Sequence, residues 1–145
     1  ISDDEPDIER IRHAACVANI ADYIEALPLA YNTMIGQDGQ GISQGQRQRI
    51  LIARVVYKNP MFVFLDEATN ALDANNERAI TENLSDFYKG KTVVVVAHRL
   101  STVRNADQIV VLDDGKIVEV GTHEELTSKR GKYFALVKNQ LELGN

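Results

Sequence analysis

Apolar residues recur at helical spacing in the first third of the chain. Isoleucine and alanine lie three or four residues apart over residues 8–18, and a second short repeat covers residues 20–27. This spacing places the apolar side chains on one side of a helix, so two amphipathic helices are predicted. Residues 33–41 contain three glycines and are expected to form a loop. A third helix is expected over about residues 46–57, before Pro60.

Two uninterrupted apolar runs follow, at residues 61–65 and 92–97, and the second contains four consecutive valines. Runs without polar alternation are typical of strands that are covered on both faces, as in a parallel sheet. Between the two runs, a helix is expected with an apolar stripe at Ile80, Leu84 and Phe87. Alternating helices and buried strands indicate an α/β fold.

The last third of the chain predicts a β-hairpin followed by two helices. Strands are expected at residues 108–112 and 116–120, and the Asp113-Asp114-Gly115 sequence between them is a hairpin signal. Thr122 and Glu125 have the spacing of a capping box, which predicts the start of a helix.

Length and composition are those of one ordinary globular domain. The chain has 145 residues, of which 44% are hydrophobic and 26% charged, and its net charge is −5. Its basic residues are scattered, which argues against a nucleic-acid partner, since neutralising phosphates requires a concentrated basic face. No apolar run reaches the roughly 18 residues that would cross a bilayer. We expect a helical part over residues 1–58 and an α/β part over residues 59–145.

The single cysteine and the first residue bear on the protein's context. Cys16 cannot form an internal disulfide, and its alanine-rich surroundings predict a small buried residue in a reducing compartment. The chain begins with Ile1 in mid-pattern and without methionine, so we expect it to be a piece of a longer polypeptide.

Two adjacent carboxylates, Asp66 and Glu67, end the first predicted strand. In open α/β sheets, ligands lie beyond the carboxyl ends of the strands. A carboxylate at Asp66 can hold Mg²⁺ directly or through water, and Glu67 can orient an attacking water, as phosphoryl transfer requires. The alternative is a solvated turn with two acidic residues, and the pair alone does not decide between the two.

A second candidate site is the start of the third helix, at Ser43-Gln44-Gly45-Gln46. Helix N-termini attract anions, because their free N–H groups and the positive end of the dipole point the same way. Ser43 adds a hydroxyl donor, and Gly45 lets a phosphate approach the backbone closely. The alternative is a plain serine cap before an arginine-rich helix.

Two further polar residues follow predicted strands. His98 comes after the valine run, and if the two strands are parallel it lies at the same end of the sheet as Asp66 and Glu67, where it can contact a terminal phosphate. Most single histidines are structural or merely exposed, so this assignment depends on its neighbours. Asp73 has a structural explanation as a helix cap.

No G-x-x-x-x-G-K-[ST] phosphate loop occurs in the chain. Gly90-Lys91-Thr92 resembles the end of one, but position 85 is Ser85 where a glycine is needed, and the tripeptide precedes a strand where a phosphate loop follows one. Half of the expected nucleotide site is therefore absent from this sequence.

Together these motifs resemble the nucleotide-binding domain of ATP-binding cassette (ABC) transporters. Residues 42–46 are similar to the signature motif, and residues 61–66 to the Walker B strand, with Glu67 as the catalytic glutamate that follows it. Residues 70–73 resemble the D-loop, and His98 resembles the switch histidine. The sequences Ala97-His98-Arg99-Leu100-Ser101-Thr102 and Gly115–His123 are similar to those of exporters whose membrane and ATPase domains share one chain, a group that includes peptide and bacteriocin exporters.

The resemblance implies a P-loop NTPase fold of which this chain holds the helical subdomain and the Walker B and switch-histidine part of a mainly parallel sheet. It implies ATP and Mg²⁺ as cofactors, with Asp66 at the metal and with Ser43, Gln44, Gly45 and Gln46 acting in trans on a nucleotide held by a second nucleotide-binding domain. Asp73 would lie at the dimer contact. Because the strand that leads to the phosphate loop is missing, we also expect an incomplete sheet and a tendency to associate.

The wider protein implied by the resemblance is an exporter at the cytoplasmic face of a bacterial inner or plasma membrane. Its transmembrane domain would meet the loop at residues 33–41. The sequence departs from the common pattern at Gln44, at Asn70, which replaces a D-loop serine, and at Gln37, where exporters often have glutamate. Two alternatives stay open: a soluble cassette protein of DNA repair or translation, and a non-catalytic fragment that binds no ATP alone.

Overall fold

The computed structural model describes residues 5–36, 41–66, 71–96 and 103–143, which form two compact units, residues 1–94 and 95–145. The expected division into a helical part over residues 1–58 and an α/β part over residues 59–145 refers to subdomains of the family, and it stays a prediction.

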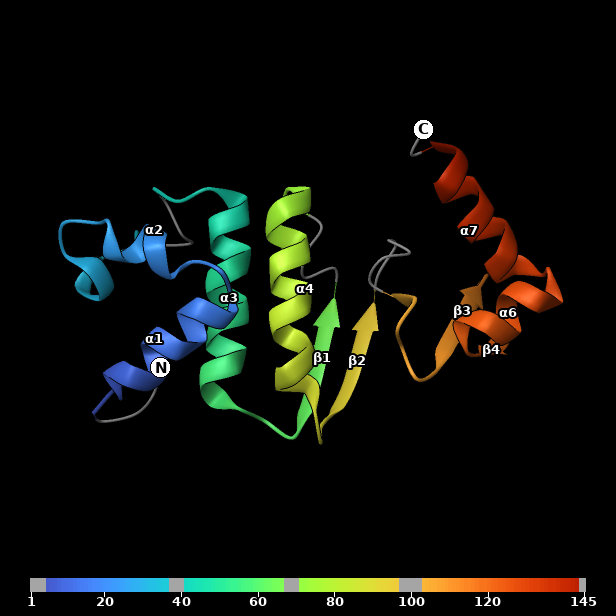
Figure 1. The fold of residues 1–145 in the computed structure, drawn as a ribbon, viewed down its shortest axis with the longest axis horizontal. Coiled ribbons are helices and arrows are strands. Elements are labelled where there is room, and N and C mark those ends of the chain that lie inside the picture. Colours follow the sequence, from blue (N-terminus) through green and yellow to red (C-terminus); the bar gives the residue numbers. More distant parts are fainter. Residues whose placement is uncertain (1–4, 37–40, 67–70, 97–102, 144–145) are drawn as a thin grey trace. The chain divides into compact units, whose positions relative to one another are not determined.

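The first unit is built mainly of helices (Figure 1). Its elements, in chain order, are α1 (Ile8–Val17), α2 (Ala21–Glu25), the short 3-10 helix η1 (Ala30–Asn32), α3 (Gln44–Lys58), β1 (Phe62–Asp66), α4 (Ala74–Tyr88) and the start of β2 (Thr92–Val96). Helices α1, α3 and α4 begin at polar residues whose side chains accept the N–H groups of the first turn. For α1 this residue is Asp7, whose carboxylate accepts from the backbone N–H of Glu9 at 3.0 Å and of Arg10 at 3.1 Å.

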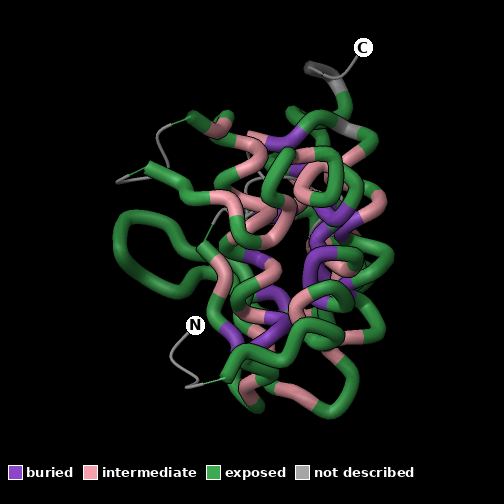
Figure 2. The backbone as a smooth tube through the Cα atoms, turned by 90° about the vertical axis from the view of Figure 1, so that its left-hand side faces the viewer, coloured by how far each residue is buried: buried purple, intermediate pink, exposed green. Residues whose placement is uncertain are grey.

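The core of the first unit lies between α1, α3 and α4. Ile80, in the predicted stripe of α4, is completely buried, and Leu84 is nearly so. The other buried members are Ala14, Ala15, Ala18, Ile20, Ala21, Ile52, Val56, Tyr57 and Leu72, which are among the buried residues drawn in purple in Figure 2. Cys16 is exposed, so the prediction of a buried cysteine is wrong: Ala14, Ala15 and Ala18 supply the inward side of α1.

Strands β1 and β2 form a two-stranded sheet, and their arrows point the same way in Figure 1. The N–H of Thr92 donates to the carbonyl of Met61 at 3.0 Å. Within β1, Val63 is buried, whereas Phe62 and Phe64 are 63% and 62% exposed. The expectation that these strands are covered on both faces is therefore wrong for the described residues, and the expectation of an incomplete sheet is confirmed.

The second unit contains a β-hairpin and two helices. Strand β3 (Ile109–Asp113) pairs antiparallel with β4 (Lys116–Gly121), followed by α6 (His123–Lys129) and α7 (Lys132–Leu143). Asp114 and Gly115 both have positive φ, at 48° and 71°, as the two central residues of a type I′ turn require. The predicted hairpin is therefore confirmed.

The helices of the second unit cover one side of its hairpin. The capping box of α6 is formed as predicted, since Thr122 Oγ1 accepts the N–H of Glu125 and the Glu125 carboxylate accepts the N–H of Thr122. The buried residues are Ile109, Val111, Leu126, Tyr133 and Val137.

Candidate functional site

Helix α3 begins with a complete capping box. Ser43 Oγ accepts the backbone N–H of Gln46 at 3.2 Å, and Gln46 Oε1 accepts the backbone N–H of Ser43 at 2.8 Å. The structural explanation of Ser43 as a helix cap is therefore correct. The first N–H groups of a helix have no partner within it. The N–H groups of Gln44 and Gly45 therefore lie at the positive end of the dipole of a 15-residue helix. This end of α3 is suited to an anion.

The start of α3 lies against the chain segment that follows β1. A Cβ atom placed on Gly45 would be 3.2 Å from the carbonyl oxygen of Ala71 and 3.6 Å from Leu72 Cδ2. One turn further along α3, Gln48 Oε1 accepts the backbone N–H of Ala71 at 3.2 Å. Two segments that the sequence singled out separately, residues 43–46 and 71–73, are thus neighbours.

Asp73 is the N-cap of α4, as predicted. Its carboxylate accepts the backbone N–H of Asn76 at 3.0 Å and of Asn75 at 3.1 Å, and the Asn76 side chain at 2.5 Å. Hydrogen bonds from the backbone and then the side chain of Asn76 are the main reason that the pKa of Asp73 is lowered, because they stabilise the charged carboxylate.

Sequence reasoning missed a polar network that joins α3 and α4 to the segment after α1. Arg49 Nη1 donates to the carbonyl of Asn19 at 2.7 Å and to Asn76 Oδ1 at 3.2 Å, and Asn19 Nδ2 donates to the same oxygen at 2.9 Å. With the bond from Asn76 to Asp73, the network connects α3 to the cap of α4. The sequence signal that could have indicated this network is the pair of polar residues Gln48 and Arg49, which lie about one turn before the buried Ile52 on α3.

Asp66 is the last residue of β1 and is exposed. In Figure 1 the carboxyl ends of β1 and β2 lie at the same end of their sheet. Glu67 and His98, which follow these two ends, lie outside the described residues, as do Gln37 and Asn70. Their predicted roles stay predictions.

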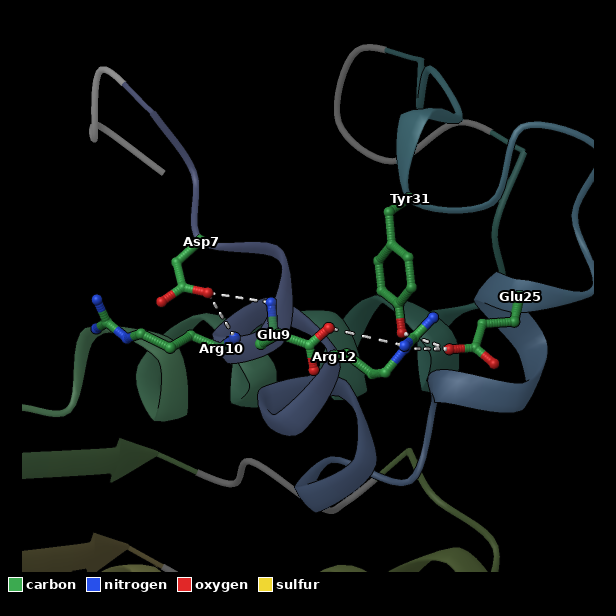
Figure 3. A network of polar contacts seen from close by, with 6 residues as sticks. All are labelled: Asp7, Glu9, Arg10, Arg12, Glu25 and Tyr31. Carbon is green, nitrogen blue, oxygen red and sulfur yellow. Dashed lines mark hydrogen bonds and ion pairs between the residues drawn. The ribbon is translucent and has the colours of Figure 1, made fainter.

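A polar cluster holds α2 and η1 against α1 (Figure 3). Arg12 Nε and the hydroxyl of Tyr31 both donate to Glu25 Oε1, at 3.0 Å and 3.3 Å. Partial burial and then the Glu25 charge raise the pKa of Tyr31, because both disfavour the phenolate.

Beside this cluster is an apolar cavity of about 230 Å³. Its lining includes Ile24 from α2, Ile50 from α3, and Met34 and Ile35 from the predicted loop. Thr33 Oγ1, also in the lining, is buried with no hydrogen-bond partner among the described residues.

Family models and curated proteins both show similarity to ABC transporters. The family model described as "ABC transporter" matches residues 4–70. "Multidrug resistance protein 3" of Entamoeba histolytica is 51% identical over 132 residues, which cover 91% of this chain and 10% of that protein. An "ATP-dependent lipid A-core flippase" of Saccharophagus degradans is 50% identical over 134 residues, covering 92% of this chain and 23% of that protein.

A solved structure agrees in fold. The "Structure of a bacterial Atm1-family ABC exporter with ATP bound" superposes with a TM-score of 0.88 and 38% identity, covering 95% of this chain and 24% of that one. The chain belongs to the ABC transporter family. It spans between about a tenth and a quarter of the length of these relatives.

Membership in the ABC transporter family confirms the family resemblance of the motifs and the α/β ATPase fold that they predicted. No helix within the described ranges is long and apolar enough to cross a membrane. The same ranges hold no group of three or more His, Cys, Asp or Glu residues that could bind a metal ion.

Proposed function

We propose that this chain is part of the ATPase of an exporter, in which ATP hydrolysis drives a substrate across a membrane. The observation that supports this best is the packing of the capped start of α3 against the segment after β1, through Gly45 and Ala71. The support lies in the fact that an anion-attracting helix end and the strand that ends at Asp66 belong to one unit. The relatives named as multidrug and flippase proteins favour a transporter over a soluble cassette protein.

Each predicted residue has a physical role in this proposal. Ser43, Gln44, Gly45 and Gln46 would receive the terminal phosphate of an ATP held by a second nucleotide-binding domain, through N–H groups and the helix dipole. Glu67 would orient the attacking water, and His98 would contact the terminal phosphate.

Mg²⁺ fits the carboxylate of Asp66. This ion prefers oxygen ligands and keeps several waters, so a single protein carboxylate with phosphate oxygens is a usual coordination. Asp66 is an exposed carboxylate at the end of a strand that Val63 anchors in the interior. When bound, the ion would neutralise charge on the phosphates that Asp66 helps to position.

The proposed partners are a second nucleotide-binding domain, arranged head to tail, and the transmembrane domain of the same exporter. The cavity beside Thr33, Met34 and Ile35 supports the second contact, because it is apolar and borders the loop expected to meet the membrane domain. The protein would then work at the cytoplasmic face of a membrane. No nucleic acid is involved in this proposal.

Turnover in the full-length transporter tests the proposal. We expect Glu67→Gln to abolish ATP hydrolysis and to accumulate an ATP-bound dimer, since the water would lose its orienting carboxylate. Unchanged turnover in that variant would contradict the assignment.

Ser43→Ala tests the role of the start of α3, with Thr122→Ala as a matched control. Both substitutions remove the hydroxyl of a capping box and each is expected to destabilise its helix by about 0.5–2 kcal/mol. We assign no site role to Thr122. ATP hydrolysis should therefore fall much further in the Ser43 variant, and equal activity in the two variants would refute a role in nucleotide contact.

The chain alone is proposed to be inactive, because it carries no phosphate-loop lysine. Calorimetric titration of Mg-ATP into the 145-residue chain should show no binding at micromolar concentrations. Clear binding would mean that copies of the chain assemble a different site.

A further inference from the structure

The peptide units on both sides of Ala71 are contacted by α3. Gln48 Oε1 accepts the Ala71 N–H at 3.2 Å, and the carbonyl oxygen of Ala71 lies where a Cβ on Gly45 would meet it. Leu72, the next residue, is only 6% exposed and belongs to the core between α1, α3 and α4. The chain therefore has little freedom to move at this point.

A second tie follows a few residues later. Asn76 donates to the Asp73 carboxylate and accepts from Arg49, the neighbour of Gln48 on α3. Two consecutive residues of α3 thus hold the segment from Ala71 to Asn76. Glu67 precedes Ala71 by four residues in the sequence, so Ala71 is the first described residue after the proposed catalytic carboxylate.

We infer that Gln48 is a positioning residue for ATP hydrolysis, acting through its hydrogen bond to Ala71, four residues after the proposed catalytic Glu67. The inference rests on the proposed function of those two carboxylates and assigns Gln48 a role separate from phosphate contact. The energetic reason is that a part-buried N–H without an acceptor is unfavourable, so loss of the Gln48 oxygen favours conformations in which Ala71 turns toward water. The carboxylates then spend less time in the productive geometry, and small misplacements of reacting groups reduce rates strongly.

Steady-state ATP hydrolysis by Gln48→Leu in the full-length transporter tests this, with Gln48→Glu as the matched variant. Leucine has a similar size and no acceptor, whereas glutamate keeps an oxygen at the same reach. We expect kcat of the leucine variant to fall about tenfold, equivalent to about 1.4 kcal/mol in the barrier, while KM for ATP stays within about twofold because the start of α3 is untouched. The glutamate variant should recover most of kcat.

A merely structural role would not produce this pattern. If Gln48→Leu turns over like the wild type, if Gln48→Glu is equally impaired, or if KM rises while kcat is unchanged, the inference is wrong. Thermal unfolding of each variant checks that it is folded, and Gln48→Met, which also lacks a strong acceptor, replaces the leucine variant if that one does not fold.

The outcome is distinguishable from failure of the proposed function. Should Glu67→Gln leave turnover intact, the catalytic assignment itself fails. Should Glu67→Gln be inactive while Gln48→Leu is normal, the carboxylate keeps its role and only the positioning by Gln48 is excluded.

Discussion

The substitution Gly45→Ala tests how firmly α3 holds Ala71, in the segment after β1. The added Cβ would lie 3.2 Å from the Ala71 carbonyl oxygen, so that oxygen has to move by a few tenths of an ångström. Two effects oppose each other: alanine is favoured over glycine in helices by about 0.8–1.0 kcal/mol, and overpacking typically costs about 1–3 kcal/mol. Because Gln48 holds Ala71 and Leu72 is buried, crowding should prevail, with a net loss of stability of about 1 kcal/mol.

Urea unfolding of the chain, followed by helical circular dichroism, gives this value, and a double-mutant cycle identifies its cause. In a Gln48→Leu background Ala71 is released, so the cost of Gly45→Ala should fall by about 0.5 kcal/mol or more. In a Gln48→Glu background the cost should stay as in the wild type. A stabilising Gly45→Ala, or an equal cost in all three backgrounds, would show that Ala71 yields freely and would refute the reasoning.

The stabilising effect of Asp73, measured as the difference in unfolding midpoint between wild type and Asp73→Ala, should be complete above the pKa of an unfolded aspartate and be lost as pH falls through the lowered folded pKa, whereas Asp73→Asn should show no such pH dependence. Ile80→Ala should lower the urea-derived stability by about 2–5 kcal/mol and Ile80→Val by about 0.5–1.5 kcal/mol, since Ile80 is completely buried. Phe64→Lys should weaken self-association in sedimentation velocity, since Phe64 is an exposed aromatic on a two-stranded sheet, and unchanged association would exclude that surface.

Features with local causes were predictable from the sequence. Ser43, Asp73 and Thr122 begin helices because an oxygen two or three residues before a backbone N–H can cap it, whatever the rest of the fold does. The turn at Asp114-Gly115 is equally local, since it needs only two residues that tolerate positive φ.

Burial was less predictable, because it depends on which other elements are present to cover a surface. The apolar run of β1 predicted a strand covered on both faces, yet Phe62 and Phe64 are exposed in the described structure. Cys16 was misplaced for a related reason: Ala14 and Ala15 of α1 and its C-cap Ala18 fill the inward side, and composition alone does not say which residue faces out.

The contact between Gln48 and Ala71 was beyond sequence reasoning because it joins residues 23 positions apart, and only the packing of α3 against the segment after β1 brings them together. This hydrogen bond matters because it lies next to the close approach of Gly45 to the Ala71 carbonyl oxygen. Ser43 and Asp66 are proposed to act on different nucleotides, yet Gly45, Gln48 and Ala71 place the chain that bears them in one unit. Under the proposed function, a displacement of the start of α3 would therefore act on Ala71, five residues after Asp66, through contacts within one unit.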